Sequence, residues 1–327
     1  MSGRGTGGSG EDELIARYFR PLARSPGAFG LTDDAAVLPA GAGDLVVTTD
    51  ALVAGVHFLP DDPPETLARK ALRVNLSDLA AKGAVPAGFV LTLALREADD
   101  TWLSAFARAL GEDAAAFACP LMGGDTVHTD GPLTLSITAF GRVPPGRMVR
   151  RAGARAGDIV AVSGTIGDAV AGLHVLKTGA AAPAYAPLVA RYRVPEPRVA
   201  LAGALLDHAT AAMDVSDGLV GDLAKLCATS GVTARIEAAR VPVSPAAAAL
   251  LAADPSLTRA ALITGGDDYE ILCTAGPAAF ESLRTKARAA GVTLTAIGRI
   301  EEGMAPPRFV DGEGRDMVFA RASYSHF

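Results

Sequence analysis

The sequence predicts two domains of the α+β or α/β class, each combining strands with helices. The chain has 327 residues, enough for two domains of ordinary size. Short apolar runs alternate with amphipathic ones along most of its length. A Pro144-Pro145-Gly146 turn and a basic run then mark a connection between domains. We expect a disordered Gly-rich tail at residues 1–10, an N-terminal domain at 11–148 and a C-terminal α/β domain at 149–327.

Apolar spacing and turn signals predict the elements of the N-terminal domain. A first helix is expected at residues 11–22, with Leu14, Ile15, Tyr18 and Phe19 on one face. The remaining pattern predicts strands at 35–38, 45–50, 88–95 and 131–143, and helices at 64–82 and 100–117.

The C-terminal domain shows a similar alternation. We expect strands at 159–163, 234–237, 271–275 and 294–300, and helices at 168–176, from Pro197, from Leu219 and at 277–290. No element is predicted in the Ala/Pro-rich stretch near residue 180.

Composition narrows the possible partners. Half of the residues are hydrophobic and the formal charge is −6, which argues against a nucleic-acid groove built on bulk basicity. No apolar run approaches membrane-spanning length, and the N-terminus has no signal-peptide core. Cys119, Cys227 and Cys273 lie far apart, which fits a reducing compartment and no structural zinc. We expect a cytoplasmic protein with no nucleic-acid or membrane partner.

Acidic residues recur in apolar settings. In "VVTTDALVAGVHF" (46–58) the polar group Thr48, Thr49 and Asp50 interrupts an apolar strand. Other acids fall in "TDDA" (Asp33, Asp34), "NLSDLA" (Asp78), "GGDT" (Asp125), "MDVSDG" (Asp214, Asp217) and "GGDDYE" (Asp267, Asp268, Glu270).

These acids lack basic neighbours in the sequence, apart from Lys82 one helical turn after Asp78. Carboxylates in such settings would take up protons unless cations were bound nearby. Carboxylate and hydroxyl oxygens are ligands that suit Mg²⁺. The motifs together therefore indicate a magnesium site.

Each motif alone also has a structural interpretation as a helix cap or turn. The stretch "VSGTIGDAVAGL" (162–173) leaves two alternatives open, an anion cradle of backbone N–H groups or a tight connection from strand to helix. It lacks the P-loop pattern. No Ser/His/Asp or Cys/His pairing stands out, so no covalent nucleophile is predicted.

A series of motifs resembles the thiamine-monophosphate kinase family, in order, from about residue 11 to 327. The motifs are "TDDAAVL", "TTDALVAGVHF", "NLSDLAAKGA", "MGGDT", "GDIVAVSGTIGDAVAGL", "MDVSDGL", "GGDDYEIL" and "YSHF". The wider superfamily includes aminoimidazole ribonucleotide synthetase, selenophosphate synthetase and HypE. The resemblance implies ATP-dependent phosphorylation of thiamine monophosphate to thiamine diphosphate with several Mg²⁺ ions. It also implies a homodimer in which the N-terminal mixed sheets form a shared β-barrel.

The resemblance also assigns site residues by position. The implied metal ligands are Asp34, Thr48, Thr49, Asp50, Asp78, Asp125, Asp214 and Asp217. The implied nucleotide contacts are Gly124, Asp125, Arg151 and Ser216, and the implied thiamine-phosphate contacts are His57, Glu270 and Tyr324. The chain departs from the family pattern at Thr32, usually glycine, and at Arg108, often an aromatic nucleotide contact.

We expect direct in-line transfer without a phosphoenzyme, because phosphoryl transfer needs alignment and charge neutralisation more than a protein nucleophile. One alternative is another ATP-using enzyme of the superfamily, such as an aminoimidazole ribonucleotide synthetase-like ligase. No cysteine precedes Cys119 and the chain ends in Ser325-His326-Phe327, which disfavours selenophosphate synthetase and HypE. The other alternative is a catalytically silent nucleotide-binding protein.

Overall fold

The computed structural model describes residues 13–33, 35–180 and 182–324. The chain divides into two compact units, the first formed by residues 1–75 and 86–142 and the second by residues 76–85 and 143–327. The predicted tail at residues 1–10 lies outside the described residues.

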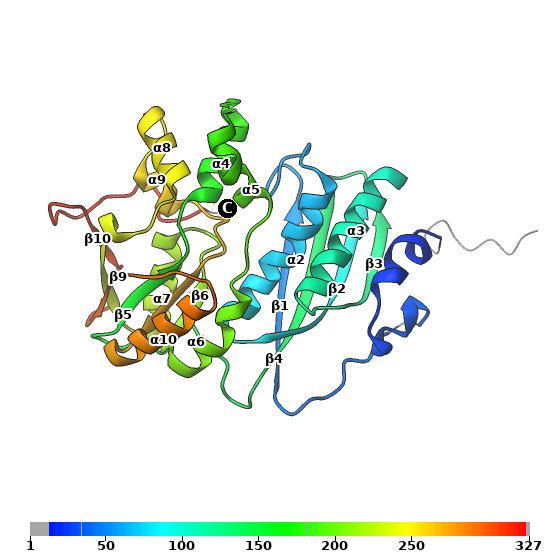
Figure 1. Ribbon diagram of the computed structural model, residues 1–327, viewed down its shortest axis with the longest axis horizontal. Coiled ribbons are helices and arrows are strands. Elements are labelled where there is room, and N and C mark those ends of the chain that lie inside the picture. Colours follow the sequence, from blue (N-terminus) through cyan, green and yellow to red (C-terminus); the bar gives the residue numbers. More distant parts are fainter. Residues whose placement is uncertain (1–12, 34, 181, 325–327) are drawn as a thin grey trace, which may run out of the picture. The chain divides into compact units, whose positions relative to one another are not determined.

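The first unit contains a four-stranded mixed sheet in the order β1-β4-β2-β3 (Figure 1). Strands β2 and β3 run parallel, with Leu91 opposite Gly124 and Thr92 opposite Asp125. A parallel pair needs a crossover, which helix α3 provides between them. The strands are β1 (Asp44–Val53), β2 (Val85–Leu95), β3 (Leu121–His128) and β4 (Thr134–Val143).

Helices α2 (Pro64–Ala81) and α3 (Asp100–Ala116) lie side by side over one face of this sheet (Figure 1). Buried Asp113 of α3 joins them, because it pairs with Arg69 and Arg73 of α2, with 2.5 Å from Arg73 Nε to Asp113 Oδ2. Helix α3 begins after Asp99, whose Oδ1 accepts the Trp102 N–H at 2.8 Å.

The opposite face of the sheet is exposed in the part of the chain that the structure describes. Along β1 the side chains alternate: Val46 and Leu52 are buried, whereas Leu45 and Val47 are 46% and 56% exposed. An apolar row on an exposed sheet face is typical of an interaction surface.

The N-terminal segment differs partly from the sequence prediction. The predicted helix at 11–22 is helical from residue 13 onward, but as a π-turn η1 (Ile15–Phe19) and a 3₁₀ turn η2 (Arg20–Leu22). A further 3₁₀ segment, η3 (Pro26–Leu31), follows. The predicted strand at 35–38 is wrong. That stretch has no strand partner, and Val37 only donates its N–H to the Gly27 carbonyl at 2.8 Å.

The second unit contains a six-stranded sheet in the order β10-β7-β9-β5-β8-β6. All neighbouring pairs are antiparallel except β10 and β7, so the expected α/β alternation gives a mixed sheet rather than a parallel one. Strand–helix alternation fixes neither the direction nor the neighbours of each strand. The strands are β5 (Ile159–Ser163), β6 (Ala211–Asp214), β7 (Thr233–Glu237), β8 (Ile271–Ala275), β9 (Leu294–Glu301) and β10 (Arg308–Val310).

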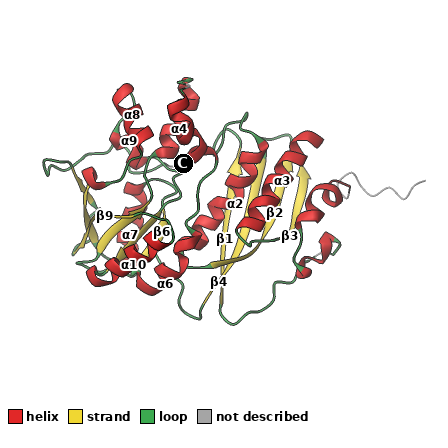
Figure 2. Ribbon diagram, in the orientation of Figure 1, coloured by secondary structure: helices red, strands yellow, loops and turns green. Residues whose placement is uncertain are grey.

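Both faces of this second sheet are covered. In β5, Val160 and Val162 pack in a core with α7, while Ala161 packs on the other side with α10. Helices α4, α5, α8 and α9 form a third cluster, and Figure 2 shows α4, α8 and α9 at one end of the unit. The helices are α4 (Asp168–Thr178), α5 (Ala186–Arg193), α6 (Ala202–His208), α7 (Leu219–Ser230), α8 (Pro245–Ala253), α9 (Arg259–Thr264) and α10 (Pro277–Ala289). Short 3₁₀ segments are η4 (Pro183–Tyr185), η5 (Val199–Leu201) and η6 (Ala238–Arg240).

The structure confirms the remaining predicted elements and adds several. The predicted helix from Pro197 begins later, as η5 and then α6. The sequence pattern missed β3, β6, β10, α5, α8 and α9. Strands as short as β6 and β10 show no clear periodicity, and the Gly-Gly-Asp of β3 is also typical of a turn. Among the described residues, no helix combines the length and apolarity needed to cross a membrane. The three cysteines are free and buried.

Candidate functional site

In the first unit, Thr48, Thr49 and Asp50 lie in β1. Because alternate side chains of a strand point to opposite faces, Thr48 and Asp50 share the face of buried Val46. Thr49 lies on the other face, where its Oγ1 donates to the Ile137 carbonyl at 3.2 Å and accepts from Thr138 Oγ1 at 3.0 Å. The hydroxyl of Thr49 and the carboxylate of Asp50 therefore point away from each other.

His57 lies in the turn that follows β1. Its Nδ1 accepts the Val53 N–H at 3.0 Å, which assigns the proton of a neutral ring to Nε2. The buried Lys70 ammonium donates to the His57 carbonyl at 3.0 Å. The ring is thus held by the strand, whereas α2 holds the backbone of His57.

Gly124 and Asp125 lie in β3, at the opposite edge of the sheet from β1. A Cβ at Gly124 would lie 2.0 Å from the Leu91 carbonyl oxygen, so only glycine allows β2 and β3 to pair here. A cavity of about 280 Å³ adjoins both residues and is lined also by Phe19, Leu31 and Met122. Two strands separate β1 from β3, which corresponds to roughly 14 Å. Asp50 and Asp125 of one chain are therefore not brought together by the sheet.

In the second unit, the loop at residues 213–218 ("MDVSDG") carries Asp214, Ser216 and Asp217. Asp222 of α7 fixes this loop, because its Oδ2 accepts the N–H groups of Ser216, Asp217 and Gly218 at 3.1, 3.0 and 3.1 Å. Burial raises the pKa of Asp222, although its bonds to Lys225 and backbone N–H groups oppose this. The sequence reasoning did not identify Asp222.

The expectation that the acids lack basic partners is wrong for Asp217. Lys225 Nζ lies 2.5 Å from Asp217 Oδ2 and 2.9 Å from Asp222 Oδ1. Lys225 stands eight residues after Asp217 and reaches it from α7. A cation that binds Asp217 would therefore compete with this ammonium group.

The segment at residues 265–270 ("GGDDYE") packs against that loop through its backbone. Asp267 N donates to the Ser216 carbonyl, Tyr269 N donates to the Val215 carbonyl and Val215 N donates to the Glu270 carbonyl, each at 2.8 Å. A Cβ at Gly266 would lie 2.1 Å from the Ser216 carbonyl oxygen, so this contact also requires glycine.

Two further chain segments meet the same place. Tyr324 N donates to the Asp217 carbonyl at 3.0 Å, and Ser77 Oγ donates to the Tyr269 carbonyl at 3.4 Å. Asp78 follows Ser77 directly. The second unit thus gathers the predicted residues Asp78, Asp214, Ser216, Asp217, Glu270 and Tyr324.

The Glu270 carboxylate is fully buried among donors. Arg198 contacts both of its oxygens, at 2.7 Å from Nε to Oε2 and 2.5 Å from Nη2 to Oε1, and Arg191 Nη2 lies 2.8 Å from Oε1. Ser163 Oγ completes the set at 2.5 Å from Oε2. Burial alone would lower the pKa of Arg198, but its contacts with Glu270 raise it above the ordinary value.

Asp268 resolves the alternative left open for the stretch 162–173. Its carboxylate is buried and accepts the N–H groups of Gly167 at 2.8 Å and Ala169 at 3.4 Å, at the start of α4. Burial raises the pKa of Asp268 well above its usual range. Since a carboxylate of the chain itself occupies this helix start, the tight-connection interpretation fits better than an anion cradle.

Lys82 joins the charged groups near β6. Its Nζ donates to the Ala212 carbonyl at 2.7 Å, and burial lowers its pKa to about 8. Asp214 and Asp78 oppose that shift, while Arg151 adds to it. The predicted residues Arg151, Asp78 and Asp214 therefore all lie within electrostatic range of Lys82. The one signal in the sequence that pointed to Lys82 is its spacing from Asp78.

The donor chemistry of both units suits Mg²⁺. Asp34 lies outside the described residues. Within the described ranges, no group of three or more His, Cys, Asp or Glu side chains is arranged to hold a metal by itself. Mg²⁺ usually binds through one or two carboxylates together with water and substrate phosphates. One or two carboxylates at each place are therefore enough to bind Mg²⁺ that arrives together with a nucleotide.

Comparisons with known proteins agree on one family. Residues 32–143 match the N-terminal domain and residues 155–306 the C-terminal domain of AIR synthase related proteins. Thiamine-monophosphate kinase of Caulobacter vibrioides is 46% identical, covering 97% of this chain and 90% of the relative. The crystal structure of thiamine-monophosphate kinase from Stenotrophomonas maltophilia is 40% identical with a TM-score of 0.83, covering 94% of this chain and 96% of that one. AaThiL, solved in complex with AMPPCP and TMP, is 30% identical with a TM-score of 0.79, covering 92% and 97%.

Proposed function

This chain belongs to the thiamine-monophosphate kinase family, and we propose that its mechanism is direct in-line transfer of the ATP γ-phosphoryl group to thiamine monophosphate. The chain is an enzyme, a kinase that forms thiamine diphosphate. The observation that carries the proposal is the likeness, over almost the whole chain, to a relative solved with AMPPCP and TMP.

The nucleotide contacts are Gly124 and Asp125 in the first unit and Arg151 and Ser216 in the second. The cavity beside Gly124 supports this assignment, since it joins an apolar wall with the Asp125 carboxylate. Apolar walls with a few polar groups are typical of small-molecule sites. We assign the nucleobase to this cavity.

The substrate contacts are His57, Tyr324 and Glu270. The His57 ring carries its proton on Nε2, which suits donation to a phosphate oxygen. Tyr324 is half-exposed and its backbone is tied to Asp217. Glu270 is enclosed by Arg191 and Arg198, so its contact with an anionic substrate would run through these two guanidinium groups.

The Mg²⁺ ligands are Asp34, Thr48, Thr49, Asp50, Asp78, Asp125, Asp214 and Asp217. When bound, Mg²⁺ would neutralise part of the charge between the two phosphates. Thr49 would contribute its backbone rather than its hydroxyl, because that hydroxyl lies on the other face of β1.

The reaction requires no covalent intermediate on the protein. A phosphate oxygen of thiamine monophosphate forms a bond to the γ-phosphorus while the bond from that phosphorus to the β–γ bridging oxygen breaks, which releases ADP. The acceptor oxygen is already anionic at neutral pH, so no strong general base is needed. The residues of the chain align the two phosphates and offset their repulsion.

We also propose a homodimer in which two N-terminal sheets close into a shared barrel. The exposed side chains of Leu45, Val47 and Val127 support this, since a second sheet would cover them. Pairing of the edge strands β1 and β3 across copies would remove both open edges. Sedimentation equilibrium tests this: a wild-type dimer should become a monomer in Val47→Asp, and a monomeric wild type would exclude it. Free buried cysteines also suit a cytoplasmic location.

The activity test uses purified protein with Mg²⁺, ATP and thiamine monophosphate, and separates products by chromatography. We expect equimolar thiamine diphosphate and ADP. A silent nucleotide-binding protein would give neither, and an aminoimidazole ribonucleotide synthetase-like ligase would turn over only its own acceptor. Rapid-quench labelling that trapped phosphate on the protein would exclude direct transfer.

Asp50→Asn tests the metal assignment, with exposed Asp130→Asn as its matched control in the same unit. Loss of a carboxylate ligand should abolish turnover and leave the fold unchanged, because Asp50 is only partly buried. Circular dichroism and activity at saturating Mg²⁺ check both variants. Persistent activity in Asp50→Asn would remove Asp50 from the ligand set.

A further inference from the structure

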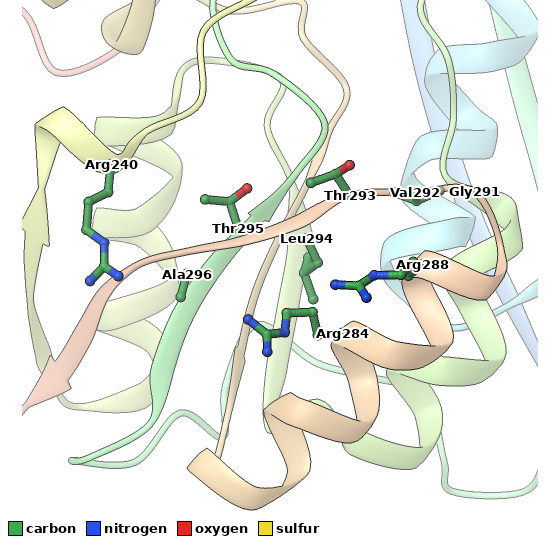
Figure 3. A pocket seen from close by; sticks show the side chains of 9 residues that line it. All are labelled: Arg240, Arg284, Arg288, Gly291, Val292, Thr293, Leu294, Thr295 and Ala296. Atoms are coloured by element: carbon green, nitrogen blue, oxygen red, sulfur yellow. The ribbon is translucent and has the colours of Figure 1, made fainter.

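A basic pocket lies in the second unit, formed by elements that carry none of the residues assigned above. Its volume is about 710 Å³, and it is lined by Arg240 of η6, Arg284 and Arg288 of α10 and the start of β9. Figure 3 shows Arg284 and Arg288 on the side of β9 that carries Leu294 and Ala296, with Arg240 farther along the strand.

The charge of this pocket is opposite to that of the chain. The lining contains three arginines and no carboxylate, although the chain has a formal charge of −6. Glu237 pairs with Arg240 at 3.3 Å and Glu281 pairs with Arg284 at 2.5 Å. For the side chain of Arg288, the described part of the structure records no ion pair or hydrogen bond. The pocket therefore retains an excess positive charge.

A neighbouring cavity of about 330 Å³ provides a comparison, since it shares Arg240 and Arg284. Its lining includes Glu237, Glu281 and Glu301 beside four arginines, so its charges nearly balance. The absence of carboxylates is thus a property of the larger pocket and not of the whole surface.

Helix stability does not explain the arrangement. Arg288 lies near the C-terminus of α10, where a cation interacts favourably with the helix dipole. Arg284 lies one turn earlier on the same face, and like charges at this spacing are mildly destabilising. Arg240 comes from a separate segment of the chain. An anion held by all three groups would offset their repulsion.

The other lining groups define the class of ligand. Thr293 and Thr295 also line the pocket, but Figure 3 shows their hydroxyls on the side of β9 away from Arg284 and Arg288, so the polar contacts of the ligand come from the arginines. Guanidinium groups bind phosphate through paired N–H donors. The volume is within the range of small-molecule sites, and Leu294 adds an apolar wall. We propose that this pocket binds a small molecule with at least two phosphate groups, at a site separate from the kinase site.

Calorimetric titration with inorganic tripolyphosphate tests the proposal, in EDTA and at physiological salt. We compare wild type, Arg284→Gln/Arg288→Gln and the matched control Arg308→Gln/Arg315→Gln, which removes two exposed arginines from the same unit. The pocket variant should weaken binding at least about tenfold, while the control stays within about twofold of wild type. Inorganic phosphate should bind more weakly than tripolyphosphate to the wild type.

Three results would overturn the proposal: no binding to the wild type, equal binding to the pocket variant, or equal loss in both variants. Equal binding to the pocket variant would place the ligand at the kinase site, and equal loss would indicate bulk charge. Thermal melting confirms that the variants fold. Their thiamine-monophosphate kinase kcat and KM should match the wild type, so the outcome does not depend on the proposed mechanism.

Discussion

The loop at residues 213–218 and the segment at residues 265–270 look alike in the sequence, because both set acids among small residues, but the structure uses their carboxylates differently. The side chain of Asp217 in the loop is 37% exposed, whereas that of Glu270 is fully buried. Asp217 meets one flexible lysine, while Glu270 meets two arginines and a serine. The sequence motif therefore does not tell which acids can bind a ligand and which hold the fold. The partners of each carboxylate in the structure do.

The largest expected effect is the loss of stability when the buried carboxylate of Glu270 is removed. Glu270→Ala leaves Arg191 and Arg198 without their buried counter-charge, so the free energy of unfolding should fall by about 3–5 kcal/mol. Urea denaturation measures it. Exposed Glu313→Ala is the control and should cost no more than about 1 kcal/mol. If Glu270→Ala does not fold, Glu270→Gln keeps the shape and removes only the charge. A loss below about 1 kcal/mol in either variant would show that Glu270 does not hold this part of the fold.

The difference between these two motifs could not be predicted from the sequence. Arg191 and Arg198 stand 79 and 72 residues before Glu270, and α5, which carries Arg191, lies in a stretch where no element was predicted. Asp222 and Lys225 lie near the loop in sequence, but within a helix whose inward face resembles ordinary apolar core. Pairing across the fold is a tertiary property, which local patterns do not contain.

More of the fold than of the site was predictable. Strands at 159–163 and 271–275 were predicted with the bounds that the structure gives, because both are continuous apolar runs bounded by turns. The strand predicted at 35–38 failed because its apolar residues have no neighbouring strand. The site residues were located through motif resemblance, and only the structure shows that Thr49 faces away from Asp50.

The second prediction concerns the ligand side of the comparison. Asp217→Asn should reduce kcat at saturating ATP by about 100-fold or more, since even outer partners of metal ligands are worth about 10–100-fold. Its unfolding free energy should change by at most about 1 kcal/mol, because the Asp217–Lys225 pair is partly exposed. Steady-state kinetics and urea denaturation measure the two quantities. If the variant lost stability and kept its activity, Asp217 would be an acid that holds the fold, as Glu270 is, and not a metal ligand.

The smallest effect is a pH dependence near the loop. The pKa of Lys82 is lowered from 10.5 to about 8 in the folded chain, so the unfolded chain binds more protons between these values. The free energy of unfolding should therefore rise with pH across this window, relative to Lys82→Met. Denaturation of both proteins from about pH 7 to pH 10 without Mg²⁺ measures this difference. If the free energies of unfolding of the two proteins changed in parallel with pH, the pKa of Lys82 would not be lowered by burial.

The central claim is that Mg²⁺ and phosphate meet the aspartates of the proposed ligand set, whereas Asp222, Asp268 and Glu270 hold the fold. A crystal structure with Mg²⁺, thiamine monophosphate and a non-hydrolysable ATP analogue tests it most directly. We predict Mg²⁺ in contact with oxygen atoms of Asp50, Asp125 and Asp217, and no metal on Asp222, Asp268 or Glu270. Metal bound to any of these last three carboxylates, or phosphates held without contact to the first three, would contradict the account.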